Sequence, residues 1–301
     1  MSLARSLDGR GATADPVGVL LTDRGSAPGF RSGRRLRRLS KRDLDQVQVC
    51  PRLFIVCAAS TLPEVADLAA DANRRHRLRG LLIRQDVETG LIGPMLDRAG
   101  LRMWENVIVH QGPPLPERIL RAWEMEAEDQ LIAAASVAGG VLFALSCALE
   151  RFEVPIRKIP ALARMRPEDV QALETSPDGS HVHWPKGDIH LDLSSLRYVI
   201  DPAWRAKADS ARVGHHRRFG EAVRAMRERH GLTQAAVDGL STRHVRRIEN
   251  GTLPKVSTLR LLARAHGMDL EHYLKTVAAA AEQLDAGSNG PRCRSRAPAA
   301  A

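Results

Sequence analysis

The sequence is poor in cysteine, and its four cysteines are not arranged for a structural cross-link. Cys50, Cys57, Cys147 and Cys293 show neither a CxxC pair nor the spacing of metal ligands. They therefore predict no disulfide framework and no cysteine-based metal site. Cys57 and Cys147 lie in apolar runs, where we expect them to pack as small hydrophobic residues. This use of cysteine is typical of a reducing compartment, and we expect a cytoplasmic protein.

Long hydrophobic runs are also missing. The longest apolar stretch, residues 131–149, is interrupted by two serines and two glycines. A membrane-spanning helix needs about 18 or more continuous apolar residues. The first residues likewise lack the hydrophobic core of a secretory signal. We therefore expect no membrane partner.

Positive charge is what the sequence has in excess, and it is unevenly distributed. The 301 residues, enough for two or three small domains, carry a formal net charge of +10. Residues 204–275 hold 15 basic and 7 acidic residues, a net charge of +8, whereas residues 49–203 hold 17 and 21, a net charge of −4. The first 48 residues hold 10 and 5. This asymmetry indicates a nucleic-acid-binding region attached to a mildly acidic body.

The two ends of the chain show little hydrophobic periodicity. Residues 1–48 are rich in Gly, Ser, Arg and Asp, and residues 31–42, RSGRRLRRLSKR, contain seven basic residues in twelve. This composition predicts a disordered basic arm that lies on DNA phosphates. An unstructured N-terminus without DNA contacts is the open alternative. We also expect residues 281–301 to be a disordered tail.

Residues 49–135 alternate between strand-like and helix-like patterns. Apolar runs at 53–60, 78–85 and 105–112 predict three strands. Between the first two, helical spacing behind a Thr61 cap predicts a helix, and residues 113–135 predict a second helix that opens on prolines. This order favours a small α/β unit with parallel strands.

The same unit shows no motif that would assign it a reaction. Ligands of parallel sheets bind beyond the carboxyl ends of the strands, here near residues 58–61. However, GxGxxG and GxxxxGK[ST] are both absent. Nothing brings Cys57, as a nucleophile, close to His110, as a base, and no triad or spaced carboxylate pair is visible. We therefore expect neither catalysis nor a cofactor, and keep a catalytic or ligand-sensing α/β unit as an alternative.

Residues 136–203 predict a compact α+β unit of paired strands followed by a proline-limited helix. Four short pieces carry a resemblance to a bacterial family called domain of unknown function 2442. They are Val154-Pro155-Ile156, Ile159-Pro160-Ala161-Leu162, Arg166-Pro167-Glu168-Asp169, and His183-Trp184-Pro185 followed by Asp188, Leu191 and Leu193. The resemblance covers about 60 residues and implies a structural rather than a catalytic motif.

The last of these pieces contains polar residues that alternate with apolar ones: His181, His183, Asp188, His190 and Asp192. Alternation places His181 and His183 on one face of a strand, an arrangement that can converge on a metal ion. A solvent-facing stripe opposite Val182 and Trp184 explains the same pattern and is typical of a half-buried strand. From the sequence alone we favour the stripe and predict no metal site.

Residues 204–280 show the periodicity of a small helical domain. Phe219, Ala222, Val223 and Met226 share one helix face, arginines occupy the other, and Gly231 ends the pattern. A Thr233 cap then predicts a short helix with Ala236 and Val237 inward. Further on, Leu259, Leu262 and Ala263 predict another buried helix face.

The next helix opens on a Ser241 cap, has Val245 and Ile248 as its core pair, and ends at Gly251. With LTQ at 232–234 and RIENG at 247–251, this region resembles the helix-turn-helix family of phage repressors and xenobiotic-response-element regulators. The resemblance covers about 60 residues. The segment between Val237 and Ser241 is three residues shorter than is usual in that family, which trims the second helix and its turn.

The resemblance implies DNA contacts along the recognition helix. Thr242, Arg243 and Arg247 match positions that face base edges, and arginine is well suited to bind guanine O6 and N7. His244 and Arg246 flank that face and are expected to contact phosphates.

Two further positions complete the implied interface, and a third has another role. Gln234 matches a phosphate contact at the start of the second helix. Asn250, after the recognition helix, matches a phosphate contact through its amide and backbone. Glu249 is expected to be structural.

Together these observations predict an α+β multidomain protein: a small α/β unit, a small α+β unit and a C-terminal all-α, repressor-like helix-turn-helix domain. We expect a bacterial transcriptional regulator of double-stranded DNA, a repressor that acts as a homodimer, because one such domain contacts only about four or five base pairs. The middle units would dimerise, sense a ligand or bind a partner protein, and an autoregulator of a toxin–antitoxin or mobile-element module is one version of this hypothesis. One alternative is an enzyme that is targeted to DNA. The other is a partner-binding adaptor, and the positive charge of residues 204–275 disfavours the adaptor.

Overall fold

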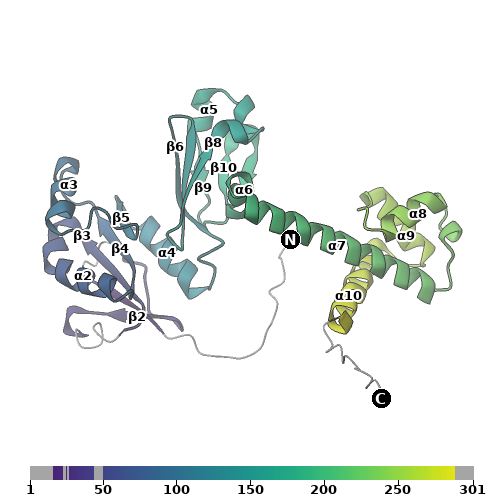
Figure 1. Cartoon of the computed structure of the whole chain (residues 1–301), viewed down its shortest axis with the longest axis horizontal. Coiled ribbons are helices and arrows are strands. Elements are labelled where there is room, and N and C mark those ends of the chain that lie inside the picture. Colours follow the sequence, from purple (N-terminus) through teal and green to yellow (C-terminus); the bar gives the residue numbers. More distant parts are fainter. Residues whose placement is uncertain (1–15, 23–24, 26, 44–49, 289–301) are drawn as a thin grey trace, which may run out of the picture. The chain divides into compact units, whose positions relative to one another are not determined.

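The computed structural model describes residues 16–22, 25, 27–43 and 50–288 (Figure 1). The chain divides into two compact units, one up to Asp201 and one from Pro202. It combines helices and sheets with a C-terminal helical region, as the sequence predicts. Among the described residues, no helix is both long enough and apolar enough to cross a membrane.

A five-stranded parallel sheet forms the first part of the N-terminal unit. Its strand order is β2-β1-β3-β4-β5, and all neighbouring strands run parallel. The strands are β1 (Val17–Leu21), β2 (Leu36–Leu39), β3 (Leu53–Ala58), β4 (Leu78–Arg84) and β5 (Val107–His110). The three strands predicted from the sequence are confirmed. Strands β1 and β2 were not expected.

The prediction of a disordered basic arm over residues 1–48 is wrong for the part that the structure describes. Leu36 and Leu39 of β2 are buried, while Arg37 and Arg38 between them are exposed. The segment before β2 is held by its backbone: the Glu124 carboxylate accepts hydrogen bonds from the amides of residues 34–36, at 2.6–3.2 Å. The arginines therefore project from an ordered edge strand. Residues 1–15 and 44–49 lie outside the described residues.

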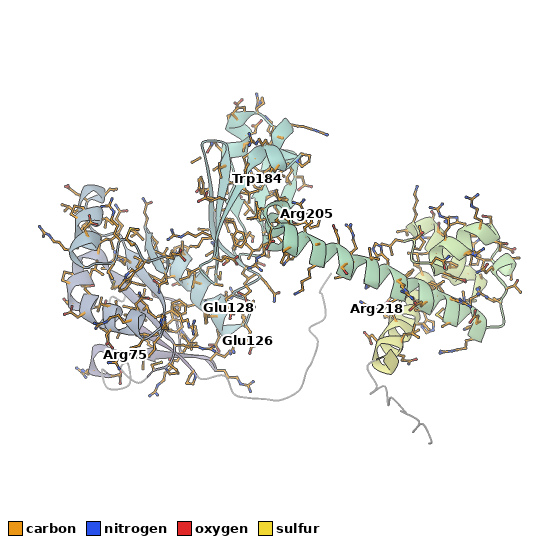
Figure 2. The ribbon with its side chains drawn as sticks, in the orientation of Figure 1. Arg75, Glu126, Glu128, Trp184, Arg205 and Arg218 are labelled. Atoms are coloured by element: carbon orange, nitrogen blue, oxygen red, sulfur yellow. The ribbon has the colours of Figure 1, made fainter. Side chains whose placement is uncertain are left out.

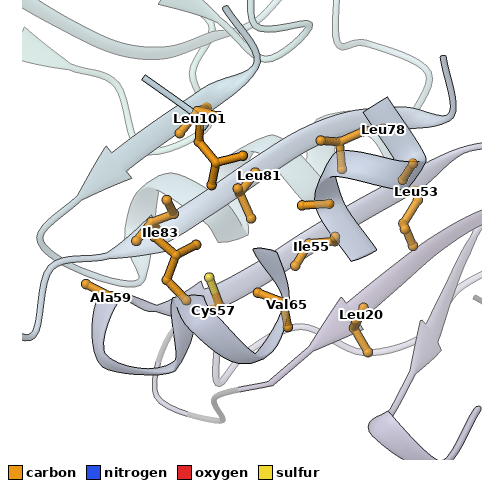
Figure 3. Packing of buried hydrophobic residues seen from close by; sticks show 14 of the residues in the cluster. Leu20, Leu53, Ile55, Cys57, Ala59, Val65, Leu78, Leu81, Ile83 and Leu101 are labelled. Carbon is orange, nitrogen blue, oxygen red and sulfur yellow. The ribbon is translucent and has the colours of Figure 1, made fainter. Parts of the chain in front are cut away.

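Helices cover both faces of this sheet because its central strand is apolar on both sides. Leu53, Ile55 and Cys57 of β3 pack with α2 (Ala66–Arg74) and α3 (Thr89–Arg98) (Figure 3). The alternate residues of β3 pack against α4 (Pro114–Glu124) on the other face. This two-sided burial is expected of a parallel sheet.

Two element boundaries differ from the sequence prediction. The helix expected over residues 113–135 ends at Glu124, and strand β6 begins at Ile132. Thr61 is no helix cap: it lies in the 3-10 helix η2 (Ala59–Glu64), and its hydroxyl donates to the carbonyl of Ala58. A second 3-10 helix, η1 (Lys41–Asp43), follows β2.

An antiparallel meander continues the same unit. Its strands are β6 (Ile132–Ala138), β7 (Val141–Ser146) and β8 (Arg151–Pro155). Gly139 and Gly140 form the two-residue hairpin turn with φ of +56° and +76°, which residues with a β-carbon rarely adopt. The Trp123 indole of α4 packs edge-on against Phe54 and donates to the Cys147 carbonyl at 2.9 Å. The predicted α/β and α+β parts thus pack against each other through one buried cluster, which includes Phe54 and Cys147.

A small three-stranded sheet closes this unit, with the order β11-β10-β9. Its core is centred on Trp184, which is fully buried and donates its indole N–H to the Val170 carbonyl (Figure 2). The elements are η3 (Ile156–Lys158), η4 (Leu162–Arg164), α5 (Pro167–Gln171), β9 (Glu174–Thr175), β10 (Val182–Trp184), η5 (Pro185–Gly187), β11 (Ile189–Leu191) and α6 (Leu193–Ile200).

The second unit is helical. Its elements are α7 (Pro202–Arg229), η6 (Gln234–Ala236), α8 (Thr242–Glu249), α9 (Val256–Ala265) and α10 (Leu270–Ser288). The predicted core residues Val223, Met226 and Ile248 are buried in one cluster with Tyr273 of α10. The short helix expected after Thr233 is only a 3-10 turn, in which Ala236 is exposed. The predicted disordered tail is helical as far as residue 288, and residues 289–301 lie outside the described residues.

Candidate nucleic-acid interface

Helix α8 has the start and end that its sequence predicts. The Ser241 hydroxyl accepts a hydrogen bond from the backbone N–H of His244 at 3.2 Å, which satisfies one of the free amides at the helix start. After Glu249 the chain leaves the helix, and Gly251 has a φ of +93°. Local sequence therefore fixes both ends of this two-turn helix.

The two sides of α8 differ completely in burial. Val245, Ile248 and Glu249 face the core of the unit. Every position at which the family resemblance implies a base or phosphate contact on or directly after this helix is exposed: Thr242, Arg243, His244, Arg246, Arg247 and Asn250. The helix thus presents a continuous polar, cationic surface.

The arginines of α8 differ from those of the preceding long helix. On α7, Arg217 pairs with Glu221 and Arg224 pairs with Glu228, both at 2.9 Å and four residues apart. Within the described part of the chain, no ion pair engages the three arginines of α8. Arg217 and Arg224 of α7 are therefore neutralised along their own helix, whereas the arginines of α8 remain available, as binding to a polyanion requires.

A buried ion pair fixes α8 against α7. The Arg227 Nε donates to Glu249 Oε1 at 2.6 Å, and the two side chains are only 10% and 4% exposed. Arg227 also donates to the Leu232 carbonyl. A bidentate, buried contact of this kind sets orientation because it is satisfied in only one geometry. The structural role expected for Glu249 is confirmed.

Gln234 belongs to the same network. Its side-chain amide donates to Glu249 Oε2 at 2.6 Å, and the residue is partly buried. The structure therefore gives Gln234 an internal contact that links η6 to α8. Its contact with a DNA phosphate stays a prediction, as do the contacts of the exposed residues on α8.

Two glycines let α8 approach α7 closely. A β-carbon at Gly220 would lie 2.5 Å from the carbonyl oxygens of Ile248 and Glu249. One at Gly251 would lie 3.2 Å from the backbone of Arg217. Sequence reasoning missed Gly220 and Arg227, although a glycine within an otherwise helical pattern is a known sign of close packing.

The carboxyl edge of the parallel sheet, the other location considered from the sequence, contains polar groups but no assembled catalytic pair among the described residues. Ser60 donates to Asp86 through its backbone N–H and its hydroxyl. Burial raises the pKa of Asp86, but these hydrogen bonds outweigh it and the net pKa is lowered. Cys57 is buried in the apolar core, and the His110 ring lies against the Gly112 carbonyl, with its pKa lowered by burial.

The polar residues around β10 and β11 are the remaining candidates for ligand binding. His183, Asp188 and His190 are the one group of three potential metal ligands found in the described part of the chain, and their ligand atoms all lie within 4.8 Å of one another. The sequence analysis considered convergence on a metal ion for His181 and His183 and favoured a solvent-facing stripe. In the structure the residues that come together are His183, Asp188 and His190.

Two segments of the chain match family models. Residues 223–273 match the helix-turn-helix family, and residues 150–201 match the family of proteins of unknown function DUF2442. Both resemblances stated from the sequence are confirmed. No curated protein and no solved structure matches the chain. The helix-turn-helix match, together with the exposed face of α8, supports a DNA-binding regulator at this coarse level.

Proposed function

We propose that the chain is a sequence-specific transcriptional repressor of double-stranded DNA, in the bacterial cytoplasm, that binds its operator as a homodimer. One observation carries the proposal: α8 exposes three arginines, none in an ion pair with a described residue, on a helix whose opposite side is locked by Val245, Ile248 and the Arg227–Glu249 pair. A rigid, capped helix with its polar side free is what insertion into the major groove requires.

The length of the recognition helix supports the proposal of a dimer. The eight residues of α8 span about 12 Å at 1.5 Å per residue, so one copy reaches only a few base pairs. Two copies bound to half-sites one helical turn apart contact twice as many base pairs, and each copy uses the same recognition helix. We therefore propose a two-fold symmetric complex.

Selection of bound DNA from a random pool tests both parts, with the whole chain as bait. We expect an enriched palindrome with half-site centres about 10–10.5 base pairs apart, or a multiple of this spacing. The matched control is a chain with Arg243→Ala and Arg247→Ala, which should enrich no sequence. Absence of any enriched site would contradict specific recognition, whereas a single asymmetric site would contradict only the dimer.

The repressor function needs a separate experiment. We propose that the chain regulates its own gene, as part of a toxin–antitoxin or mobile-element module. The enriched palindrome should then overlap the promoter of that gene. A transcriptional reporter driven by that promoter should then fall when the chain is supplied and recover with the Arg243→Ala, Arg247→Ala variant. An increase in reporter signal would identify an activator instead.

We propose no catalytic activity for the N-terminal unit, and a ligand-sensing role for its parallel sheet as the second candidate. The strand order places β1 and β3 where successive crossovers leave in opposite directions, the position at which such sheets bind ligands. The hydroxyls of Thr22 and Thr61 lie there, 3.4 Å apart. A small molecule bound at this edge should change the DNA affinity of the wild type but not of Thr22→Val, which removes one of the two hydroxyls.

A further inference from the structure

The small sheet of the first unit carries a polar row on one face. In the pairing of its strands, His183 of β10 lies opposite Glu174 of β9 and opposite His190 of β11. Directly paired residues of antiparallel strands point to the same side of a sheet. The alternate residues of β10, Val182 and Trp184, are buried on the other side. The buried residues on the opposite face of the sheet thus fix the backbone of this row.

Three side chains of this region lie close together, with their ligand atoms within 4.8 Å of one another. The imidazole rings of His183 and His190 are stacked, with centroids 4.2 Å apart and an interplanar angle of 17°, so one ring has to tilt before both nitrogens can bind the same ion. Their Nε2 atoms lie 3.8 Å and 3.0 Å from the same oxygen, Oδ1 of Asp188. Asp188 reaches this position from the turn after η5, where it adopts a left-handed conformation with a φ of +46°.

One atom of the cluster lacks a hydrogen-bond partner among the described residues. The Nε2 of His183 is inaccessible to solvent and makes no hydrogen bond with any described residue. A buried polar atom without a partner destabilises the fold, and most buried polar atoms in folded proteins have a hydrogen-bond partner. This nitrogen also faces the region where the other two ligand atoms lie. An ion bound between the three atoms would satisfy it.

We propose that His183 Nε2, His190 Nε2 and Asp188 Oδ1 bind a divalent transition-metal ion of the Zn²⁺, Co²⁺ and Ni²⁺ type. Two ligand atoms about 2.0–2.2 Å from a tetrahedral ion lie roughly 3.3–3.5 Å apart. The distances of 3.0 Å and 3.8 Å to Asp188 bracket this value. Imidazole favours these ions over Mg²⁺ and Ca²⁺, which prefer all-oxygen ligands.

The site is open on its outer side. His190 is 48% exposed and Asp188 is 90% exposed, so an ion can reach these two ligands from solvent without unfolding of the sheet. The side chain of His183 is 27% exposed but its Nε2 is covered, so this ring has to turn toward the ion. Three protein ligands leave at least one coordination position for water or for another donor. His181, with its ring centroid 4.7 Å from that of His190, and Glu174, paired with His183 in the sheet, lie beside the three ligands.

Calorimetric titration of the whole, chelator-treated chain with Zn²⁺ tests the proposal. We expect one ion bound per chain and an affinity at least about tenfold lower in His183→Gln and in His190→Gln, because each removes a ligand. Asp188→Asn should also weaken binding, while asparagine tolerates the left-handed backbone at this position.

Two controls exclude binding by other histidines. His76→Asn replaces an exposed histidine of the same unit that also has a positive φ, of +56°. The pair His215→Gln, His216→Gln removes the adjacent histidines of α7. Both controls should bind Zn²⁺ as the wild type does. Unchanged affinity in His183→Gln and His190→Gln, or an equal loss in a control, would overturn the site.

A spectroscopic readout keeps the test independent of folding effects. Co²⁺ in a four-coordinate site of nitrogen and oxygen ligands absorbs visible light much more strongly than six-coordinate aqueous Co²⁺. The wild type should show this absorption at one equivalent, and His190→Gln should lose it while its circular-dichroism spectrum stays unchanged. A wild-type spectrum that matches aqueous Co²⁺ would contradict the proposed coordination.

Discussion

The arginines of α7 and α8 show that the surroundings of an arginine side chain decide whether it stabilises the fold or is available to bind a ligand. Arg227 is buried and bonded to Glu249, Arg224 is exposed and paired along its own helix, and Arg243 is exposed without an ion pair among the described residues. The same guanidinium group therefore stabilises the fold at the first position, has little effect at the second and remains available for a ligand at the third.

Loss of the buried pair should destabilise the second unit strongly. Arg227→Met leaves the Glu249 carboxylate buried without its cation, which costs about 3–5 kcal/mol. Hydrogen exchange of the α8 amides in the whole chain measures this change. The matched control, Arg224→Met, removes an exposed pair on the surface of α7, which should contribute little to stability. Similar losses in the two variants would show that the buried pair contributes no more than a surface pair.

Loss of an outward arginine should instead affect recognition. Arg243→Ala should weaken binding to the specific site by about 1–3 kcal/mol and relax the preference at one base pair, because arginine at the first turn is placed to contact a base edge. Stability should be unchanged, since the side chain is exposed. Competition binding against the selected site and random DNA checks this. Equal losses on both would make Arg243 a phosphate contact.

Asp178, in the turn between β9 and β10, should titrate at unusually low pH. A hydrogen bond from the Ser180 backbone, with others from the Ser176 and Ser180 hydroxyls, lowers its pKa to about 2. A folded-state pKa below the unfolded value means that the group stabilises the fold above about pH 4 and that this contribution is lost as the pH falls toward 2. Carboxyl NMR should show that midpoint. Ser180→Ala should raise the midpoint only part of the way to 3.8, because the backbone hydrogen bond remains. No change would exclude the hydroxyl as a cause.

At the scale of the element, the position of α8 depends on the absence of a side chain on α7. Gly220→Ala would place a β-carbon 2.5 Å from two carbonyl oxygens at the end of α8, which are backbone atoms that cannot rotate away. We expect a loss of about 1–3 kcal/mol in the stability of the second unit and weaker DNA binding.

Gly214 on the same helix provides the control for this prediction. A β-carbon there would meet only the Arg218 side chain, at 3.8 Å. Gly214→Ala should stabilise α7 by about 0.5–1 kcal/mol, because alanine loses less backbone entropy in a helix. Hydrogen exchange separates the two effects. An equally stable Gly220→Ala chain would mean that α7 and α8 can move apart without cost.

Elements whose signals are local could be predicted from the sequence, and those that depend on distant partners could not. Ser241 and Gly251 mark the ends of α8 by their own chemistry, and the apolar run of β3 is evident in one segment. Strand β2 forms only because Leu36 and Leu39 pack on the sheet and Glu124, about 90 residues later, holds the preceding backbone. No local window contains that information.

The candidate sites divide in the same way. The exposed residues of α8 follow from helical periodicity together with a family resemblance, whereas the Arg227–Glu249–Gln234 network needs the crossing of three elements. The convergence of His183 with His190 depends on the register of two strands. A shift of the pairing by one residue would place them on opposite faces. Alternation alone could not distinguish these cases.

At the scale of the whole molecule, residues 31–42 contribute both a strand to the fold of the first unit and positive charge to its surface. Its prediction as a DNA-binding arm is now testable without a truncation, because Arg31, Arg34, Arg37 and Arg38 are exposed. Their joint replacement by glutamine should preserve the sheet. If these arginines bind phosphates, the slope of log affinity against log salt should flatten by about 0.9 for each phosphate that is no longer neutralised. An unchanged slope would assign them to protection of the sheet edge.

Removal of residues 1–48 should have a different effect from removal of the charges. The deletion takes away β1, which lies between β2 and β3 in the sheet, and with it the buried residues Val19 and Leu20. Strand β3, buried along its whole length, would then become an edge strand with unpaired backbone groups, and such edges promote association. We expect the deleted chain to aggregate or to lose the folded signal of β3 and β4 in hydrogen exchange, while the α8 amides stay protected because the second unit has its own core. The glutamine-substituted chain is the control and should remain soluble, with β3 protected as in the wild type. A soluble deleted chain with full protection of β3 would show that the remaining strands form a stable sheet without β1.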